Sequence, residues 1–166
     1  MSRDLAAGRR APLLIVKQGT HARGVFAGEP IPAATWILRF SGPFLRYAET
    51  SATTYALQIG PDLYIGADGG PDDFVNHSCD PNAGVVIDGT TVDLVAIRDI
   101  AEGEEIFFDY STTLDENDFV MDCRCGAPSC RHRIGDGRDL PEPVWQRYLG
   151  LGIIPAYVRE SRAARW

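Results

Sequence analysis

Four cysteines are the residues of this 166-residue chain whose spacing most directly indicates chemistry. Three of them lie close together as Cys123-Arg-Cys125-Gly-Ala-Pro-Ser-Cys130, and the fourth, Cys79, lies in the segment Asn76-His-Ser-Cys-Asp-Pro-Asn82. Two thiolates one residue apart, followed by a Gly and a Pro that bend the chain back to a third, can occupy three corners of a tetrahedron. Cys79 is the only cysteine left for the fourth corner. The spacing therefore predicts one structural zinc ion held by all four cysteines.

Other interpretations of these thiols are weaker on physical grounds. Disulfides are disfavoured in an intracellular chain, and unrelated buried thiols are not expected to share such close spacing. His132 lies two residues after Cys130 and is an alternative ligand in place of one thiolate. Four protein ligands leave the metal no open position. We therefore expect a structural ion that fastens the C-terminal segment to the rest of the chain, without a catalytic role.

The charges of the chain are unevenly distributed. The formal net charge is −7, but residues 1–122 carry eight basic and 19 acidic side chains, whereas residues 123–166 carry eight arginines and four acids. Nucleic-acid binding by the acidic part is disfavoured, because phosphate contacts need clustered Lys or Arg. An acidic surface favours a cationic partner such as a lysine-rich peptide, although acidity also serves solubility alone. The sequence leaves the oligomeric state open, a homodimer included.

Length and composition are typical of a single globular domain. At 166 residues there is room for one ordinary domain, and 45% hydrophobic with 23% charged residues are close to globular averages. No apolar run approaches the roughly 20 residues that span a bilayer, and residues 1–10 lack the apolar stretch of a secretory signal. We therefore expect an intracellular protein without membrane contact, cytoplasmic by default and nucleoid or nuclear if its partner is a chromatin protein.

Short alternating runs between Gly, Pro, Asn and Asp predict a mostly β domain with many short strands. Pro141 and Pro155 each suit the first turn of a helix. Helices are therefore expected over Pro141–Leu149 and Pro155–Arg162, with one further helical turn near Asp72–Asn76. The expected strands are Leu13–Lys17, Gly24–Ala27, Trp36–Ser41, Ala56–Ile59, Leu63–Ile65, Val85–Asp88, Val92–Arg98 and Glu105–Phe107.

Three motifs, in this order, resemble one known family. They are Asn76-His-Ser-Cys-Asp-Pro-Asn82, then Ile97–Tyr110 with Gly103-Glu-Glu-Ile-Phe-Phe-Asp-Tyr110 at its end, and then the three-cysteine segment. Together they resemble the SET domain with its post-SET zinc segment, the fold of most protein-lysine methyltransferases, from about Leu13 to Ile134. The resemblance implies short curved sheets with a knot-like threading of the segments around Asn76 and Tyr110, followed by short helices.

The resemblance also implies a division of the chain. Residues 1–12 would form an N-terminal extension, 13–111 the SET domain, 112–138 the post-SET zinc segment and 139–166 a C-terminal helical tail. Nothing before residue 13 resembles a pre-SET zinc cluster, so the chain resembles a minimal stand-alone member of the family.

A binding site for S-adenosylmethionine, the methyl donor of the family, is implied as well. His21-Ala-Arg-Gly24 resembles the early glycine loop whose backbone holds this cofactor. The Asn-His pair is expected to hold the adenosyl part, since an amide offers both a donor and an acceptor to adenine. The residues implied as cofactor-binding are Ala22, Arg23, Gly24, Tyr55, Asn76 and His77.

Four residues depart from the family pattern. The first glycine of the loop is Ala22, and Asp73 stands where many members have Arg before the Asn-His pair. Arg39-Phe40-Ser-Gly-Pro43 resembles the family's E-Y-x-G-E, with Phe40 in place of a channel tyrosine and Pro43 in place of an acid. These changes remove one contact to the cofactor carboxylate, which Arg23 could replace, and one hydrogen bond to the substrate amine.

Tyr110 is the residue that the resemblance implies for catalysis. Methyl transfer to lysine needs a neutral amine, an in-line sulfonium about 3 to 3.5 Å away and exclusion of water. Forming the neutral amine at pH 7 costs roughly 4.6 kcal/mol from the pKa of free lysine, and burial beside a cation reduces that cost. The Tyr110 hydroxyl would orient the amine, because a phenol is a poor base at neutral pH.

Phe40 and Phe108 are implied as the walls of the substrate channel. Phe108 stands at a Phe/Tyr position that governs the number of methyl groups added in the family. Because a Phe leaves space and has no hydroxyl to restrain a methylated amine, we expect di- or trimethylation.

The sequence therefore predicts an S-adenosylmethionine-dependent protein-lysine N-methyltransferase that acts on a basic, histone-like protein segment. Two alternatives stay open. The four departures favour a catalytically weak SET-like module that binds a lysine-containing partner. Methyl transfer to a small amine or another side chain is favoured only if peptides fail as substrates.

Overall fold

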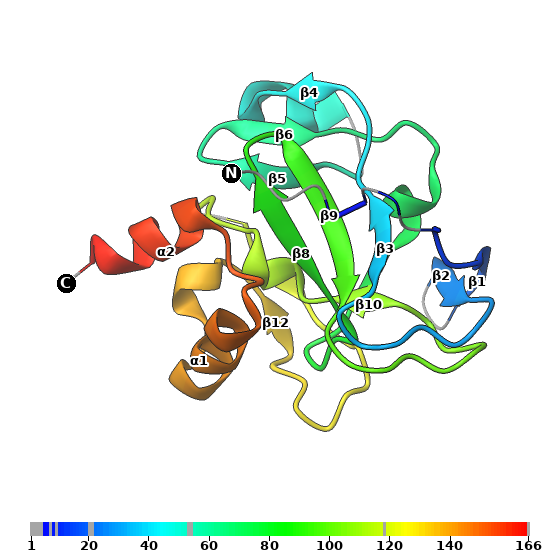
Figure 1. Ribbon diagram of the computed structural model, residues 1–166. Helices are drawn as coiled ribbons and strands as arrows, with labels where there is room; N and C mark the ends of the chain where they lie inside the picture. Colours follow the sequence, from blue (N-terminus) through cyan, green and yellow to red (C-terminus); the bar gives the residue numbers. More distant parts are fainter. Residues whose placement is uncertain are drawn as a thin grey trace.

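Within the residues that it describes, the computed structural model gathers the strands into five small sheets (Figure 1). The described residues are 5–165 except 7, 9, 20, 21, 53, 54 and 118. His21, the first residue of the predicted cofactor loop, therefore lies outside them. No helix in the described part of the chain has the length and apolarity to span a membrane.

The central sheet is antiparallel and has the strand order β3 (Trp36–Arg39), β9 (Thr91–Ala96), β8 (Ala83–Asp88). β8 and β9 pair over their full length around a turn at Gly89, whose φ of 61° suits a residue without a Cβ. Val92 and Leu94 lie two residues apart on β9 and are fully buried in the main core. This hairpin is the longest paired element among the described strands.

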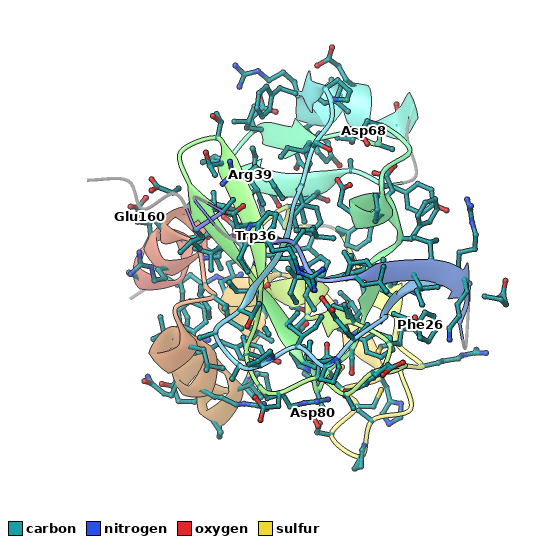
Figure 2. The ribbon with its side chains drawn as sticks, turned by 45° about the vertical axis from the view of Figure 1, so that its right-hand side comes forward. Phe26, Trp36, Arg39, Asp68, Asp80 and Glu160 are labelled. Carbon is teal, nitrogen blue, oxygen red and sulfur yellow. The ribbon has the colours of Figure 1, made fainter. Side chains whose placement is uncertain are left out.

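The opposite face of β9 buries a carboxylate. Asp93 is 2% exposed and accepts hydrogen bonds from Trp36 Nε1 at 2.9 Å and from Arg39 Nε at 2.8 Å. Figure 2 labels these two side chains of β3 next to each other on the sheet. A buried carboxylate that is paired and hydrogen-bonded fixes how β3 and β9 align.

The remaining strands are short and surround the central sheet. A three-stranded sheet has the order β4-β6-β5, and three further sheets have two strands each, of which β7–β10 is parallel. The strand bounds are β1 Leu14–Gln18, β2 Arg23–Ala27, β4 Phe44–Leu45, β5 Leu57–Gly60, β6 Leu63–Ile65, β7 Asn76–His77, β10 Phe107–Phe108, β11 Met121–Asp122 and β12 Arg133–Ile134. Short 3-10 helices are η1 Tyr47–Ala52, η2 Pro71–Phe74, η3 Tyr110–Thr112 and η4 Gly137–Asp139.

Two C-terminal helices, α1 (Glu142–Leu151) and α2 (Ala156–Ala163), lie together at one side of the molecule (Figure 1). α1 ends at Gly152, which adopts the left-handed conformation that commonly terminates helices. A second hydrophobic cluster, separate from the main core, joins these helices to the sheet. It contains Leu140, Trp145, Tyr148, Ile153, Ile154 and Val158, with Val86 and Ile97 packed against it.

The predicted mostly β architecture with a helical C-terminus is confirmed. Seven of the eight expected strands occur with shifts of a few residues, and both expected helices begin directly after their prolines. The eighth strand, expected over Glu105–Phe107, overlaps β10 only at Phe107. Glu105 forms only an isolated bridge with Phe26, and the strand pairing begins at Phe107, where the chain meets β7.

Candidate active site and metal centre

The parallel pairing of β7 with β10 gathers the predicted site residues. Phe107 lies opposite Asn76 and Phe108 opposite His77, and the amide of Ser78 donates to the carbonyl of Phe108 at 3.1 Å. Two segments that are distant in sequence thus run side by side. Tyr110, which follows the strand, is brought next to the Asn-His pair.

Asn76 uses its side-chain amide inside the protein. Nδ2 donates to the carbonyl of Arg23 at 3.1 Å and to Glu105 Oε1 at 2.8 Å. Both amide hydrogens are therefore used, and no donor of this side chain is left for adenine. A Cβ at Gly24 would overlap the buried Glu105 carboxylate, so glycine is needed for this close approach. Asn76 and Glu105 together fix the position of the Arg23 loop.

His77 is engaged at both ring nitrogens. The amide of Tyr110 donates to Nδ1 at 3.1 Å, and Nε2 lies 3.3 Å from Cys79 Sγ. Burial lowers the pKa of His77 to about 4, although Asp109 opposes the shift, so the imidazole is neutral at pH 7. Because Nδ1 accepts, the hydrogen is on Nε2 and points to the sulfur. His77 thus connects the backbone of Tyr110 to the cysteine cluster.

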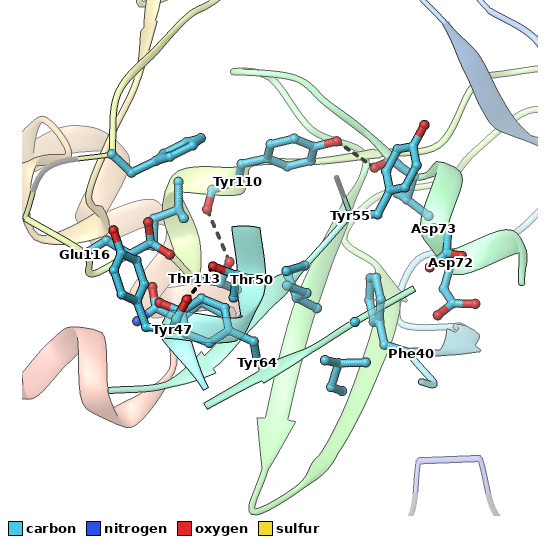
Figure 3. A pocket seen from close by; sticks show the side chains of 18 of the residues that line it. Phe40, Tyr47, Thr50, Tyr55, Tyr64, Asp72, Asp73, Tyr110, Thr113 and Glu116 are labelled. Carbon is cyan, nitrogen blue, oxygen red and sulfur yellow. Dashed lines mark hydrogen bonds between the residues drawn. The ribbon is translucent and has the colours of Figure 1, made fainter. Parts of the chain in front are cut away.

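A cavity of about 610 Å³ lies beside Tyr110 (Figure 3). Both predicted channel residues, Phe40 and Phe108, line it. The Phe40 ring meets the Phe108 ring edge-on at 6.1 Å between centroids, and the Phe108 and Tyr110 rings are 4.8 Å apart. These rings form an apolar wall. Such a wall disfavours the charged form of an amine that enters the cavity.

The hydroxyl of Tyr110 is fixed in place. It donates to the carbonyl of Val75 at 2.9 Å, which leaves the lone pairs of the phenol oxygen as acceptors (Figure 3). Burial, reinforced by Tyr55 and Glu105, raises the pKa of Tyr110 well above its usual range. The residue is thus a neutral phenol at pH 7. It can accept a hydrogen bond from an amine but cannot take its proton.

The side chains of Arg23 and Tyr55 meet on the ring of Phe74. The Arg23 guanidinium lies 4.0 Å from the centroid of this ring, and the Tyr55 ring meets it edge-on at 6.0 Å. Among the described residues, no carboxylate forms an ion pair with this guanidinium. Tyr55 lines the cavity, whereas the loop of Ala22, Arg23 and Gly24 does not. Sequence reasoning missed Phe74 as the residue that connects the two.

The four cysteines cluster as predicted from their spacing. Cys123 Sγ lies 3.7 Å from Cys79 Sγ and 3.7 Å from Cys130 Sγ. With Zn–S bonds of about 2.3 Å, the edge of a tetrahedral site is about 3.8 Å. The amide of Cys79 donates to Cys125 Sγ at 3.4 Å, which places the fourth sulfur beside the others. The donor set and its spacing fit a tetrahedral zinc ion.

The ligand atoms that lie mutually within 4.8 Å are those of His77, Cys79, Cys123 and Cys125. Cys130 is therefore on the rim of the cluster, close to Cys123. The hydrogen on His77 Nε2 makes this residue a donor to the Cys79 sulfur, and a metal ligand would need a free nitrogen lone pair there. His132 Nδ1, the alternative ligand, lies 3.9 Å from Cys130 Sγ. Four sulfur ligands remain the better donor set.

A model of the SET domain family matches residues 22–111, more than half of the chain. The chain belongs to the SET domain family. Similar curated proteins include the "Histone-lysine N-methyltransferase, H3 lysine-4 specific" of Candida albicans, 29% identical over 149 residues, covering 79% of this chain and 14% of that protein. The human "Histone-lysine N-methyltransferase 2D" is 29% identical over 126 residues, covering 65% of this chain and 2% of that protein.

Solved structures agree with this assignment. The crystal structure of KRYPTONITE in complex with mCHG DNA and SAH has a TM-score of 0.64 and 30% identity, covering 76% of this chain and 30% of that chain. A second structure of KRYPTONITE, with mCHH DNA, an H3(1-15) peptide and SAH, has a TM-score of 0.63 and 27% identity, covering 78% of this chain and 31% of that chain. This SET domain therefore spans a small part of the curated and solved relatives that it matches.

Three of the four departures of this SET domain from the family pattern, Ala22, Pro43 and Asp73, have a local hydrogen-bond partner. The carbonyl of Ala22 accepts from the amide of Gly19 at 2.7 Å, which closes the loop between β1 and β2. The carbonyl of Pro43 accepts from the amide of Gly66 at 2.9 Å. Asp73 Oδ2 accepts from the amide of Gly69 at 2.7 Å and stabilises the loop before η2. These residues are thus integrated into their loops.

Sequence reasoning missed a buried ion pair that joins the three-cysteine segment to the candidate active site of this SET domain. Asp109, 1% exposed, accepts from Arg131 Nη2 at 2.7 Å, and its other oxygen lies 2.7 Å from Arg131 Nη1. The Tyr148 hydroxyl of α1 donates to Asp109 Oδ2 at 2.9 Å. The available signal was position: Asp109 precedes Tyr110, and Arg131 follows Cys130. The carboxylate therefore joins three parts of the chain directly behind Tyr110.

Proposed function

We propose that this SET domain transfers a methyl group from S-adenosylmethionine to a lysine side chain of a basic protein segment. The observation that carries the proposal is the placement of Tyr110. Its hydroxyl is held by the carbonyl of Val75 at one end of an apolar cavity, beside the Asn-His pair. The names of the relatives, which specify histone H3 lysine 4, support the same activity. The acidic character of residues 1–122 favours a substrate of opposite charge.

The cavity would receive the lysine side chain between Phe40, Phe108 and Tyr110. Burial against these rings disfavours the ammonium form and lowers the pKa of the lysine amine. The neutral amine can donate one N–H to the Tyr110 oxygen, which directs its lone pair along the channel. No side chain has to act as a base during transfer. The contribution of the protein is orientation and the exclusion of water.

S-adenosylmethionine, when bound, supplies a methyl group on a sulfonium sulfur. We infer that the loop Ala22-Arg23-Gly24, Tyr55 and the Asn76-His77 segment hold it next to Tyr110. Arg23 would bind its carboxylate, because this guanidinium is held over Phe74 without an ion pair among the described residues. The backbone of Asn76 and His77 would make their contacts, since their side chains are used inside the protein.

A zinc ion bound by Cys79, Cys123, Cys125 and Cys130 is part of the same proposal. Its role would be to fold residues 121–134 against the site, since a filled tetrahedral centre has no position for substrate. His77 would then donate to a metal-bound thiolate and at the same time hold the amide of Tyr110.

The alternative is a catalytically weak module that binds a lysine-containing partner. It is favoured by Ala22, Phe40, Pro43 and Asp73, where this chain departs from the family pattern. Calorimetric titration of S-adenosylmethionine into zinc-loaded protein separates the two, because it does not require a known substrate. Saturable binding at one site per chain supports the enzyme, and no binding up to millimolar concentration supports the module.

The activity itself is tested with Tyr110→Phe. We expect this variant to bind S-adenosylmethionine and a lysine-rich peptide with unchanged affinity, while methyl transfer falls by at least about a hundredfold, because the amine loses its orienting acceptor. Transfer is measured by mass spectrometry of the peptide. Unchanged turnover in Tyr110→Phe would refute the role assigned to this residue.

A further inference from the structure

The cavity beside Tyr110 extends beyond what a lysine side chain needs. At one end lie Phe40 and Tyr55, and at the other end Glu116 and Tyr47 (Figure 3). The site described above uses only the first end. The second end is formed by η1, by β6 and by the segment that follows η3.

Glu116 is the carboxylate at this second end. Burial, followed by the nearby Glu116 carboxylate, raises the pKa of Tyr64 well above its usual range, so the phenol keeps its proton. A carboxylate can accept about four hydrogen bonds, so one neighbouring hydroxyl would leave most of its capacity unused. In the described part of the chain, no Lys or Arg forms an ion pair with Glu116.

The acids near Glu116 in sequence or in the cavity have other partners. Asp115 is paired with Arg138 at 3.4 Å and accepts from Ser161 at 2.8 Å. Asp72 and Asp73, the other acids that line the cavity, accept from the amides of Ser41 and Gly69. Asp72 and Asp73 lie at the end of the cavity near Phe40 (Figure 3), so Glu116 is the carboxylate that can meet a positive charge at the second end.

Two aromatic rings lie at the same end of the cavity as this carboxylate (Figure 3). Tyr47 and Tyr64 both line the cavity, with centroids 6.2 Å apart and planes inclined by 45°. Tyr64 is 2% exposed, whereas Tyr47 is 56% exposed at the rim. Phe119 and Met121 add exposed apolar surface on the same rim. A carboxylate that shares one end of a cavity with aromatic rings suits a guanidinium, which stacks on rings and pairs with carboxylates in a planar fork.

We propose that Glu116, Tyr47 and Tyr64 form a subsite for an arginine of the substrate close in sequence to the methylated lysine. The inference rests on the proposed function and specifies its substrate class. An extended segment advances about 3.3 Å per residue, and every second side chain points to the same face. The arginine is therefore expected two positions from the lysine, where both side chains can enter one cavity.

The test uses peptides with one central lysine and one arginine placed in turn at each position within four residues of it. Binding is measured by fluorescence anisotropy and methyl transfer by mass spectrometry, on the same peptides and the zinc-loaded protein. We expect one arginine position to increase binding and kcat/KM by about tenfold, the factor that corresponds to 1.4 kcal/mol. The gain should lie in KM, with kcat unchanged, since the subsite is remote from the transferred methyl group.

Two variants at Glu116 and one matched control assign the effect. Glu116→Gln should remove the preference for arginine, and Glu116→Arg should transfer it to a peptide with glutamate at the same position. Glu102→Gln removes one charge from an exposed residue that does not line the cavity, and it should keep the preference. The charge reversal distinguishes recognition from a structural role, which would lower binding of all peptides equally.

Each outcome bears on one hypothesis. Arginine-dependent binding that is lost in Glu116→Gln supports the subsite even without methyl transfer, and the absence of transfer would then count against the proposed function alone. Transfer or binding that is indifferent to arginine overturns the subsite while leaving the methyltransferase intact. A preference that survives both Glu116 variants overturns the subsite too, as does an absence of peptide binding.

Discussion

Phe108 is the residue that sets how much room the proposed lysine channel gives to the amine. Its ring is buried between Phe40, at 6.1 Å, and Tyr110, at 4.8 Å. Phe108→Tyr would add a hydroxyl in this wall that restrains a methylated amine by volume and by a hydrogen bond. We therefore expect the product to shift from di- or trimethyl-lysine in the natural protein to monomethyl-lysine. Mass spectrometry of a peptide incubated to completion measures the shift.

A matched control for Phe108→Tyr is Phe119→Tyr. Phe119 also lines the cavity, but it is 39% exposed on the rim, so the added hydroxyl would point to water. This variant should keep the methyl number of the natural protein. Trimethylated product from Phe108→Tyr would contradict the steric explanation, and so would an equal shift in both variants.

For single residues, the sequence motifs predicted which side chains come together, but not the hydrogen bonds that their atoms form. Asn76, His77, Phe108 and Tyr110 do meet, as the resemblance implied. The amide of Asn76, however, is bound to the carbonyl of Arg23 and to Glu105. Such partners come from segments far apart in the sequence, so spacing alone does not indicate them. Glu105 was missed because a single acid in an acidic motif carries no distinguishing pattern.

Among the elements, the strands with a periodic pattern could be predicted and the two-residue strands could not. β8 and β9 have alternating buried residues and a glycine turn, which the sequence shows directly. β7, β10, β11 and β12 have two residues each, too few for a period. Their pairing is set by tertiary contacts such as that of Phe107 with Asn76. These short pairs nevertheless position the proposed active site and the cysteine cluster.

The segment between β11 and β12 has few internal contacts and depends on the cysteine cluster. Only two residue pairs join β11 to β12, and the amide of Cys123 donates to the carbonyl of His132 at 3.0 Å. Cys123 and Ile134 of this segment form a buried cluster with Cys79. The Arg131–Asp109 pair then attaches it to the residue before Tyr110. Without a metal, Cys79 and Cys123 would be neutral thiols at pH 7, because burial raises the pKa of both, and no ion would then hold the four sulfurs together.

Removal of zinc should therefore loosen this segment selectively. We expect a chelator to release one zinc ion per chain and to accelerate amide hydrogen exchange over residues 121–134, because metal binding supplies on the order of 10 kcal/mol for ordering such segments. Exchange in β8 and β9 should change little, since these strands lie in the main core. Cys123→Ser should have the same effect without a chelator. Unchanged exchange over residues 121–134 after loss of zinc would refute a metal-dependent segment.

At the scale of the whole molecule, two hydrophobic clusters are joined by buried tyrosines. Tyr148 of α1 donates to Asp109 beside the site. The hydroxyl of Tyr157 in α2 shares its one hydrogen between the carbonyls of Gln58, at 3.1 Å, and Thr113, at 2.5 Å. Tyr148 belongs to the second cluster, and the partly buried Tyr157 packs against it. Their carbonyl and carboxylate partners were not predictable, because helix periodicity shows which face is buried but not what it meets.

These tyrosines make the stability of the molecule depend on alkaline pH. Burial, followed by nearby charges, raises the pKa of Tyr64, Tyr110, Tyr148 and Tyr157 in the folded protein. In the unfolded chain a tyrosine loses its proton near pH 10. The folded state then binds more protons than the unfolded state. The stabilisation is complete below about pH 10 and is lost as the pH rises above it.

Tyr157→Phe tests this linkage one residue at a time. Each such tyrosine should lower the free energy of unfolding by about 1.4 kcal/mol per pH unit above pH 10. The variant loses hydrogen bonding worth about 1 kcal/mol and should be less stable than the natural protein at pH 8. Above pH 10 its free energy of unfolding should fall less steeply with pH, by the contribution of one tyrosine. The two stability curves should therefore converge as the pH rises. Urea unfolding from pH 8 to pH 11 measures how the free energy of unfolding of each protein changes with pH. The two slopes should be equal below pH 9. Parallel curves up to pH 11 would contradict a protonated Tyr157 in the folded state.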